Sequence, residues 1–148
     1  MIHIWDRGFA GSPWTTLALD HALRFSLRWN KSYHLIGPDG RKQDVWKISR
    51  GKRSWEYRLI WDARRRCYRA TGVVALPVHF PDDDRQLFLV VSHLGYGRKP
   101  WYLITTESVH IAEQAWKIIF AYARCWQIEM SLRFTKTELA FESPRLLK

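Results

Sequence analysis

The sequence holds few cysteines, and the two that are present, Cys67 and Cys125, lie far apart. They form no C-x-x-C pair, so the chain offers neither a zinc-binding cysteine motif nor a disulfide framework. No run of residues approaches the roughly 18 apolar positions that a membrane-spanning helix needs. The opening residues, MIHIWDRG, also lack the basic segment and apolar run of a signal peptide. These absences predict an intracellular protein of a reducing compartment, with no membrane partner.

Acidic residues are scarce relative to basic ones. The 148 residues include 24 Lys and Arg but only 14 Asp and Glu, which gives a formal net charge of +10. The excess is concentrated in residues 41–69, where eleven basic residues stand against three acids. Such a block favours a polyanionic partner, and nucleic acid is the commonest one. The simpler alternative is a charged surface that serves only solubility.

Hydrophobic residues are plentiful, at 47% of the chain with nine Trp. A chain of this length suits one domain with a substantial core. The apolar run at residues 2–5 predicts a buried strand that stops at Asp6. A helix is expected from Ser12, as its N-cap, through Phe25, followed by a strand over residues 25–29.

In the middle of the chain, apolar residues recur at every second position. Residues 32–105 therefore predict five or six antiparallel strands separated by turns. Within this stretch, one strand is expected to place Trp55, Tyr57, Leu59 and Trp61 on one face and Glu56, Arg58 and Ile60 on the other. The stretch also carries most of the net charge, so we interpret it as a basic, β-rich insertion.

The last third of the chain predicts one long helix. After Ser108, a candidate N-cap, more than twenty residues contain neither Gly nor Pro and are apolar nearly all round. The expected fold class is therefore α/β, although α+β fits the same order of elements. It would combine a β-α-β part at residues 1–31, the insertion at 32–105, and the closing helix within 106–148.

Within the long helix, Tyr122, Glu129 and Lys136 recur at intervals of seven residues. A seven-residue step returns to within about 20° of its starting direction, so these three side chains share one helix face. Arg133 lies near the edge of the same stripe, whereas Arg124 is turned about 100° away from it. The alternative is a solvated face on which Glu129 and Arg133 form an i,i+4 ion pair.

Asp6 stands where a central strand is expected to end. Functional side chains of α/β proteins gather at such strand ends, although an Asp-x-Gly at a strand end is more commonly just a turn. Paired with Glu129 on a helix packed against the same sheet, Asp6 could bind a hard divalent cation such as Mg²⁺. Two such ions can activate water and stabilise the leaving oxygen in phosphodiester chemistry.

Three spaced motifs carry a family resemblance. IHIWDRGFAG at residues 2–11, PWYLITTE at 100–107 and Y-x6-E-x6-K at 122–136 occur in this order along the chain. Together they resemble the catalytic domain of bacterial insertion-sequence transposases of the DDE type, in the family with a Tyr-Arg-Glu-Lys signature. The resemblance implies a partial RNase H-like core, Mg²⁺ in a two-metal site, and DNA transposition by cleavage and strand transfer of double-stranded transposon ends. It also implies a cytoplasmic location at the bacterial nucleoid, and it allows a homodimer on DNA.

The resemblance also implies roles for single residues. Asp6 and Glu129 resemble the second and third acids of the catalytic, metal-binding triad. Tyr122 and Lys136 would hold DNA phosphates, and Trp101 resembles an aromatic residue on which a flipped base stacks. The DNA-binding residues expected on this basis are Trp101, Tyr122, Arg124, Arg133 and Lys136.

The chain departs from the family pattern in two places. The arginine of the signature belongs four residues before Glu129, where this chain has Cys125 with Arg124 beside it. A thiol cannot make the bidentate phosphate contact of a guanidinium, so either Arg124 reaches round to the phosphate or the contact is lost. The first acid of the triad belongs well before the DRGF motif, and only five residues precede Asp6. We therefore expect one incomplete catalytic domain, truncated at its N-terminus and inactive or nearly so.

Two other functions fit the same residues. In a non-catalytic DNA-binding module, the basic insertion would bind DNA and the acids would be remnants. In a basic, β-rich interaction protein that binds no nucleic acid, raising the salt concentration would leave partner binding unchanged.

Overall fold

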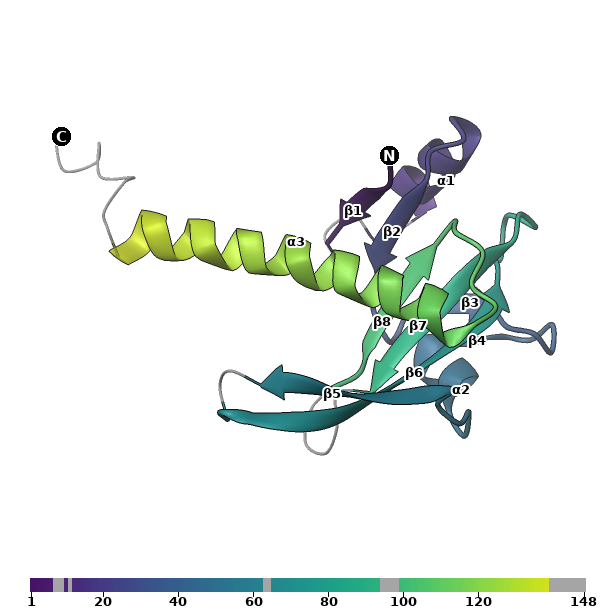
Figure 1. Cartoon of the computed structure of the whole chain (residues 1–148). Coiled ribbons are helices and arrows are strands. Elements are labelled where there is room, and N and C mark those ends of the chain that lie inside the picture. Colours follow the sequence, from purple (N-terminus) through teal and green to yellow (C-terminus); the bar gives the residue numbers. More distant parts are fainter. Residues whose placement is uncertain (7–9, 11, 63–64, 94–98, 139–148) are drawn as a thin grey trace, which may run out of the picture.

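A six-stranded mixed sheet forms the centre of the protein (Figure 1). The computed structural model describes residues 1–6, 10, 12–62, 65–93 and 99–138, and the side chains of these residues except 12, 62 and 126–138. The sheet order is β1-β2-β8-β7-β6-β5, in which β1 runs parallel to β2 and all other neighbours are antiparallel. The strands are β1 (His3–Trp5), β2 (Phe25–Arg28), β5 (Glu56–Asp62), β6 (Cys67–Val78), β7 (Leu87–His93) and β8 (Trp101–Thr105). The structure is thus α/β, and the strands expected near residues 2–5 and 25–29 are confirmed.

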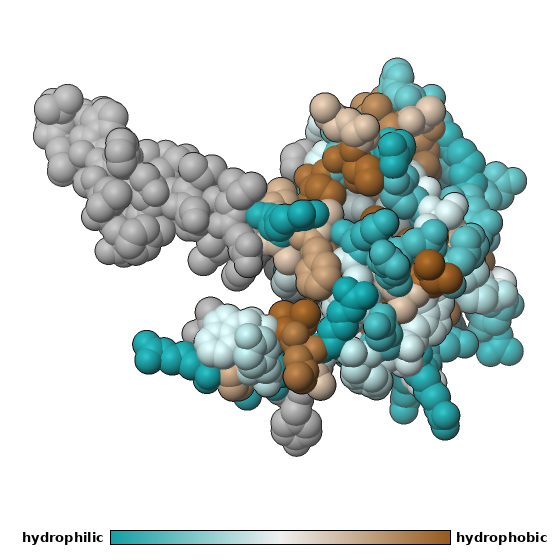
Figure 2. All heavy atoms as spheres, in the orientation of Figure 1, coloured by the Kyte–Doolittle hydropathy of each residue, from teal (hydrophilic) through white to brown (hydrophobic). Residues whose placement is uncertain are grey.

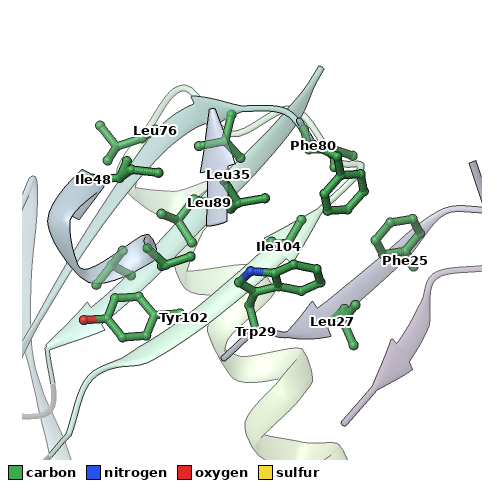
Figure 3. Close-up of a cluster of buried hydrophobic side chains, with 14 of the residues drawn as sticks. Phe25, Leu27, Trp29, Leu35, Ile48, Leu76, Phe80, Leu89, Tyr102 and Ile104 are labelled. Carbon is green, nitrogen blue, oxygen red and sulfur yellow. The ribbon is translucent and has the colours of Figure 1, made fainter. Parts of the chain in front are cut away.

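Each face of the sheet is covered by a different layer. The long helix α3 (Ala112–Glu138) packs on one face, where Trp116 and Ile119 join a buried cluster with Val73 and Leu103. A second cluster lies on the opposite face, with residues from α1 (Ser12–Asp20), β3 (His34–Ile36) and α2 (Val45–Ser49). Figure 3 shows this second core, with the Trp29 and Leu35 side chains close to those of the sheet. Within the described ranges, no helix is both long and apolar enough to cross a membrane.

Helix α1 ends at Asp20, which corrects the expectation that it would continue to Phe25. Ala22 adopts a left-handed conformation with φ of 53°. Its N–H donates to the carbonyl of Leu19, and the N–H of Leu23 donates to that of Ala18. This pair of bonds is a Schellman motif, which satisfies the last helical carbonyls and turns the chain into β2. Because Gly usually occupies the left-handed position, Ala22 did not indicate in the sequence that the helix ends there.

The strands expected within residues 32–105 are confirmed, but they form two sheets. Strands β5 to β8 join the main sheet, whereas β3 and β4 (Lys42–Asp44) pair with each other in a second sheet. An antiparallel bridge between Ile36 of β3 and His79 links this small sheet to the end of β6. The short helix α2 follows β4 and was not expected. Asp44 is its N-cap, since its Oδ1 accepts a hydrogen bond from the Lys47 N–H at 2.9 Å. The buried residues of α2 cover the sheet face opposite α3.

Helix α3 is confirmed as a long helix, although it begins at Ala112 and not directly after Ser108. The Gln114 side chain accepts hydrogen bonds from the N–H groups of His110 and Ile111, at 2.7 and 3.3 Å. A side chain from the first turn thus satisfies backbone donors that precede the helix, as the Glu or Gln of a capping box does. The helix start is therefore set by Gln114.

Strands β5 and β6 form a hairpin that projects beyond the rest of the sheet, on the same side as the C-terminal part of α3 (Figure 1). The expected alternation of β5 is confirmed. Tyr57, Leu59 and Trp61 are exposed on one face, whereas Glu56 faces α3 and accepts a hydrogen bond from the Trp116 indole nitrogen at 3.1 Å. The hairpin therefore has one face against α3 and one face open to solvent.

Candidate functional site

Three neighbouring strands place candidate residues at one end of the sheet. Asp6 follows β1 directly and Arg28 ends β2, and these two strands are parallel with Trp5 opposite Leu27. Trp101 begins β8, which runs antiparallel to β2. Because the carboxyl ends of parallel strands meet at one edge, and the start of an antiparallel neighbour meets them there, all three residues lie close together.

Tyr122 on α3 completes this group from above the sheet. Its hydroxyl donates a long hydrogen bond of 3.4 Å to Oδ1 of Asp6. Its ring meets that of Trp101 edge-on, with 5.2 Å between the centroids. The Arg28 guanidinium carbon lies 5.6 Å from the Trp101 centroid and 6.0 Å from that of Tyr122, within the range of cation–π contacts. We call Asp6, Arg28, Trp101 and Tyr122 the Asp6 cluster.

The cluster joins a buried phenol to a carboxylate open to solvent. Only 4% of the Tyr122 surface is exposed, whereas Asp6 is exposed. Burial raises the pKa of the Tyr122 phenol and Asp6 acts in the same direction, while hydrogen bonding and charge from Arg28 oppose the shift. With a pKa above its usual value near 10, the phenol keeps its proton at neutral pH and acts as a donor. The site thus presents a donor, a cation and an acceptor beside an aromatic face.

The remaining residues expected from the sequence belong to α3. Arg124 and Cys125 are both exposed on this helix. Glu129 lies in α3 seven residues after Tyr122, so its Cα is on the same side of the helix about 10 Å further along the axis. The side chains of Glu129, Arg133 and Lys136 lie outside the described residues. The structure therefore brings together Asp6, Trp101 and Tyr122 from the expected set.

Arg28 belongs to the cluster and was not expected from the sequence. A signal was present, because the alternation that buries Phe25 and Leu27 on one face turns Arg28 to the other. A cation at the end of a strand next to the one that carries Asp6 is then a candidate site residue. This alternation identifies Arg28 as a site residue only once β1 and β2 are known to be parallel neighbours.

A pocket of about 230 Å³ adjoins the cluster and shares Arg28 with it. Lys31 and Lys99 add two further cations to its lining, and Trp46 and Tyr102 add aromatic walls. Positive charge beside aromatic rings suits a phosphate attached to a planar base. The pocket extends the cluster along the same end of the sheet.

Among the side chains that the structure describes in the cluster, Asp6 supplies the carboxylate that could contact a metal ion. Its oxygens and its exposure suit Mg²⁺, which prefers oxygen ligands and retains several waters. Among the side chains that the structure describes, no group of three His, Cys, Asp or Glu could hold a metal ion. The side chain of Glu129, which would have to supply a second carboxylate, lies outside those residues.

Comparison of the chain with protein-family models and with curated proteins found no match.

Proposed function

We propose that this chain forms part of the catalytic domain of a DDE-type DNA transposase with an RNase H-like core. The supporting observation is the contact between Asp6 and Tyr122, which lie 116 positions apart in the sequence. The family resemblance rests on separate Asp, Trp and Tyr-Glu motifs, and a shared catalytic site requires these motifs to converge. Asp6, Trp101 and Tyr122 do meet at one end of the sheet.

In this proposal, Asp6 and Glu129 hold Mg²⁺ between the sheet and α3. Bound Mg²⁺ would activate the attacking oxygen and stabilise the leaving oxygen during strand cleavage and transfer. Tyr122 positions Asp6 through its hydrogen bond, and because burial keeps the phenol protonated, that bond persists at neutral pH. A complete site of this type needs three acids, and the resemblance assigns two of them to residues of this chain.

Arg28 supplies the guanidinium that the family signature places where this chain has Cys125. It lies over the Tyr122 ring and is only partly exposed, which limits the orientations of its planar fork. A guanidinium held in this way suits bidentate binding of a phosphate. Arg28 would then bind a DNA phosphate next to the metal-binding carboxylates, while the Tyr122 hydroxyl stays hydrogen-bonded to Asp6.

Trp101 and the adjoining pocket would hold the nucleotide next to that phosphate. One edge of Trp101 is fixed by Tyr122 and its face is next to Arg28. Lys31 and Lys99 line the pocket together with Arg28. A base in the pocket would find aromatic walls, and its phosphates would find cations.

The test measures binding of a fluorescently labelled DNA duplex by anisotropy at several salt concentrations. Each phosphate contact contributes about −0.9 to the slope of log K against log[salt]. Arg28→Ala should weaken binding by about 5- to 150-fold and reduce the slope by about 0.9, since Arg28 makes a charged contact. Lys117→Ala removes the same charge from an exposed position on α3 and serves as the control. Equal effects of the two substitutions would contradict the proposal.

The second candidate is a non-catalytic DNA-binding module, which is favoured by the basic block at residues 41–69. In that case DNA binding would be indifferent to Mg²⁺ and to Asp6. In the transposase, Mg²⁺ should strengthen DNA binding, and Asp6→Asn should abolish this gain. The two candidates therefore differ in a single titration of Mg²⁺ into the protein–DNA complex.

A further inference from the structure

The outer face of the β5–β6 hairpin carries a row of exposed side chains that the Asp6 cluster does not use. Tyr57, Leu59 and Trp61 are 66, 69 and 53% exposed along β5, and Tyr68 is 65% exposed on β6. These four residues point away from α3, since the alternate residues of β5 face that helix. We call Tyr57, Leu59, Trp61 and Tyr68 the hairpin platform.

The rings of the hairpin platform are supported by the strands beneath them. Trp61 is paired with Tyr68 across the hairpin, and their rings meet edge-on with 5.1 Å between the centroids. Tyr57 is paired with Gly72, and a Cβ at Gly72 would lie 2.9 Å from the Tyr57 ring. Close approach of Tyr57 to the backbone therefore depends on the missing side chain of Gly72. The outer face of the hairpin thus carries aromatic rings at both ends, with Tyr57 at one end and the Trp61–Tyr68 pair at the other.

Exposed arginines flank this face at both ends of β5. Residues 53–70 contain six Arg against two acids. Arg58 and Glu56 are both turned toward α3, where Arg58 lies over the Trp116 ring and Glu56 is bonded to the Trp116 indole nitrogen. Arg53 precedes β5, while Arg65 and Arg66 lie at the turn of the hairpin, and all three are exposed. Figure 2 shows strongly hydrophilic side chains next to pale and apolar ones on this projecting hairpin.

We propose that the hairpin platform binds unpaired nucleic acid bases, which stack on Tyr57, Trp61 and Tyr68 while the flanking arginines hold the phosphates. Stacking on exposed aromatic rings within a basic surface is the general mode of binding single-stranded nucleic acid. A second copy of this chain fits less well, because two hairpins of the same positive charge would repel each other. Duplex DNA also fits less well, because its base faces are already stacked and a flat row of rings cannot reach them.

This inference does not rest on the proposed transposase function, because the platform lies on the opposite face of the sheet from the Asp6 cluster. The two sites can be tested separately. In an Arg28→Ala background, Trp61→Ala should weaken binding of an unpaired strand by the same factor as in the parent, and substitutions in the platform should leave the salt slope of duplex binding unchanged.

The experiment titrates the full chain into a labelled oligothymidylate of about 15 nucleotides and measures anisotropy. Loss of one stacked base by substitution with Ala corresponds to about 1–3 kcal/mol, so Trp61→Ala should weaken binding by about 5- to 150-fold. Trp61→Phe keeps an aromatic face and should stay within about 3-fold of the parent. Because Trp61 is more than half exposed, both variants should stay folded at the temperature of the titration, which circular dichroism checks.

Leu59→Ala is the matched control, because Leu59 is as exposed as the rings of the same row but cannot stack. The proposal expects less than about a 2-fold change. If Leu59→Ala weakened binding as much as Trp61→Ala, general apolar docking and not stacking would be responsible, which would overturn the proposal. The proposal would also fail if Trp61→Ala dissociated a dimer in sedimentation and left binding of the oligonucleotide intact.

Discussion

The indole nitrogen of Trp116 donates a hydrogen bond to Glu56, and the ring of Trp116 lies beneath the guanidinium of Arg58 at 5.0 Å. Trp116 is only 1% exposed, so this contact fixes α3 against the edge strand β5. Since α3 also carries Tyr122, the same helix holds the hairpin on one side and the Asp6 cluster on the other. The position of the cluster thus depends on packing at a distance from it.

Trp116→Phe should lower the free energy of unfolding by about 1–3 kcal/mol, because it removes a hydrogen bond and leaves unfilled volume in the core. Urea denaturation followed by circular dichroism measures the change. Trp55→Phe is the control, since Trp55 is 43% exposed, and it should change stability by less than about 0.5 kcal/mol. Similar losses in both variants would show that Trp116 does not have this role.

Gly72→Ala should destabilise the hairpin through a clash and not through backbone strain. The added Cβ would lie 2.2 Å from the Ser54 hydroxyl oxygen and 2.9 Å from the Tyr57 ring. Overpacking of this kind costs about 1–3 kcal/mol, measured by urea denaturation. Adding Ser54→Gly should recover part of the loss. If the stability losses of Gly72→Ala and Ser54→Gly simply added in the double variant, a clash with Ser54 would not be the cause of the destabilisation.

Much of the fold could be predicted from local patterns. The alternation at Tyr57, Leu59 and Trp61 and the apolar run of α3 each gave the correct element, because a single period dominates each stretch. Helix α1 ended early because Ala22 adopts a conformation that Gly normally occupies. Helix α2 is too short for a period to be recognised, and its signal was the Asp44 N-cap alone.

The candidate site was predictable only in part, for a different reason. Asp6 was predicted from its position at the end of a strand, whereas Trp101 and Tyr122 were predicted from the family resemblance. Arg28 depends on the parallel pairing of β1 with β2, which no local pattern encodes. Residues joined only by tertiary structure are therefore the ones that the sequence did not predict.

The Tyr122 phenol should make stability depend on pH in the alkaline range. Burial raises its folded-state pKa above the unfolded value of about 10. The proton therefore favours the folded state below pH 10, and this contribution is lost as the pH rises through the raised pKa. Tyr122→Phe should flatten the loss of stability between about pH 9 and pH 11 in chemical denaturation.

Tyr102 provides the comparison for this experiment, because its pKa is also raised by burial and its contribution persists in the Tyr122→Phe variant. The difference between the parent and the variant thus reports Tyr122 alone. Parallel curves for the two proteins would show that Tyr122 ionises equally well in the folded and unfolded states.

Cys125→Arg should restore the arginine of the family signature. Cys125 is exposed on α3 three residues after Tyr122, so a guanidinium at this position can reach the same face. In the Arg28→Ala background, Cys125→Arg should recover most of the lost affinity for duplex DNA, because both guanidinium groups would bind the same phosphate. Lys117, which is exposed on the same helix, is the control, and Lys117→Ala should change affinity little. Equal gains from Cys125→Arg with and without Arg28 would indicate two separate contacts.

In the proposed site, Asp6 and Glu129 share one metal ion. The most direct test titrates Mn²⁺ into the protein–DNA complex and follows free Mn²⁺ by electron paramagnetic resonance. If one ion bridges both carboxylates, Asp6→Asn and Glu129→Gln should each abolish most of the binding, and the double variant should lose little more. Asp39→Asn, in an exposed turn, should bind Mn²⁺ as the parent does. Losses that simply add, or a single variant that binds Mn²⁺ like the parent, would contradict the account.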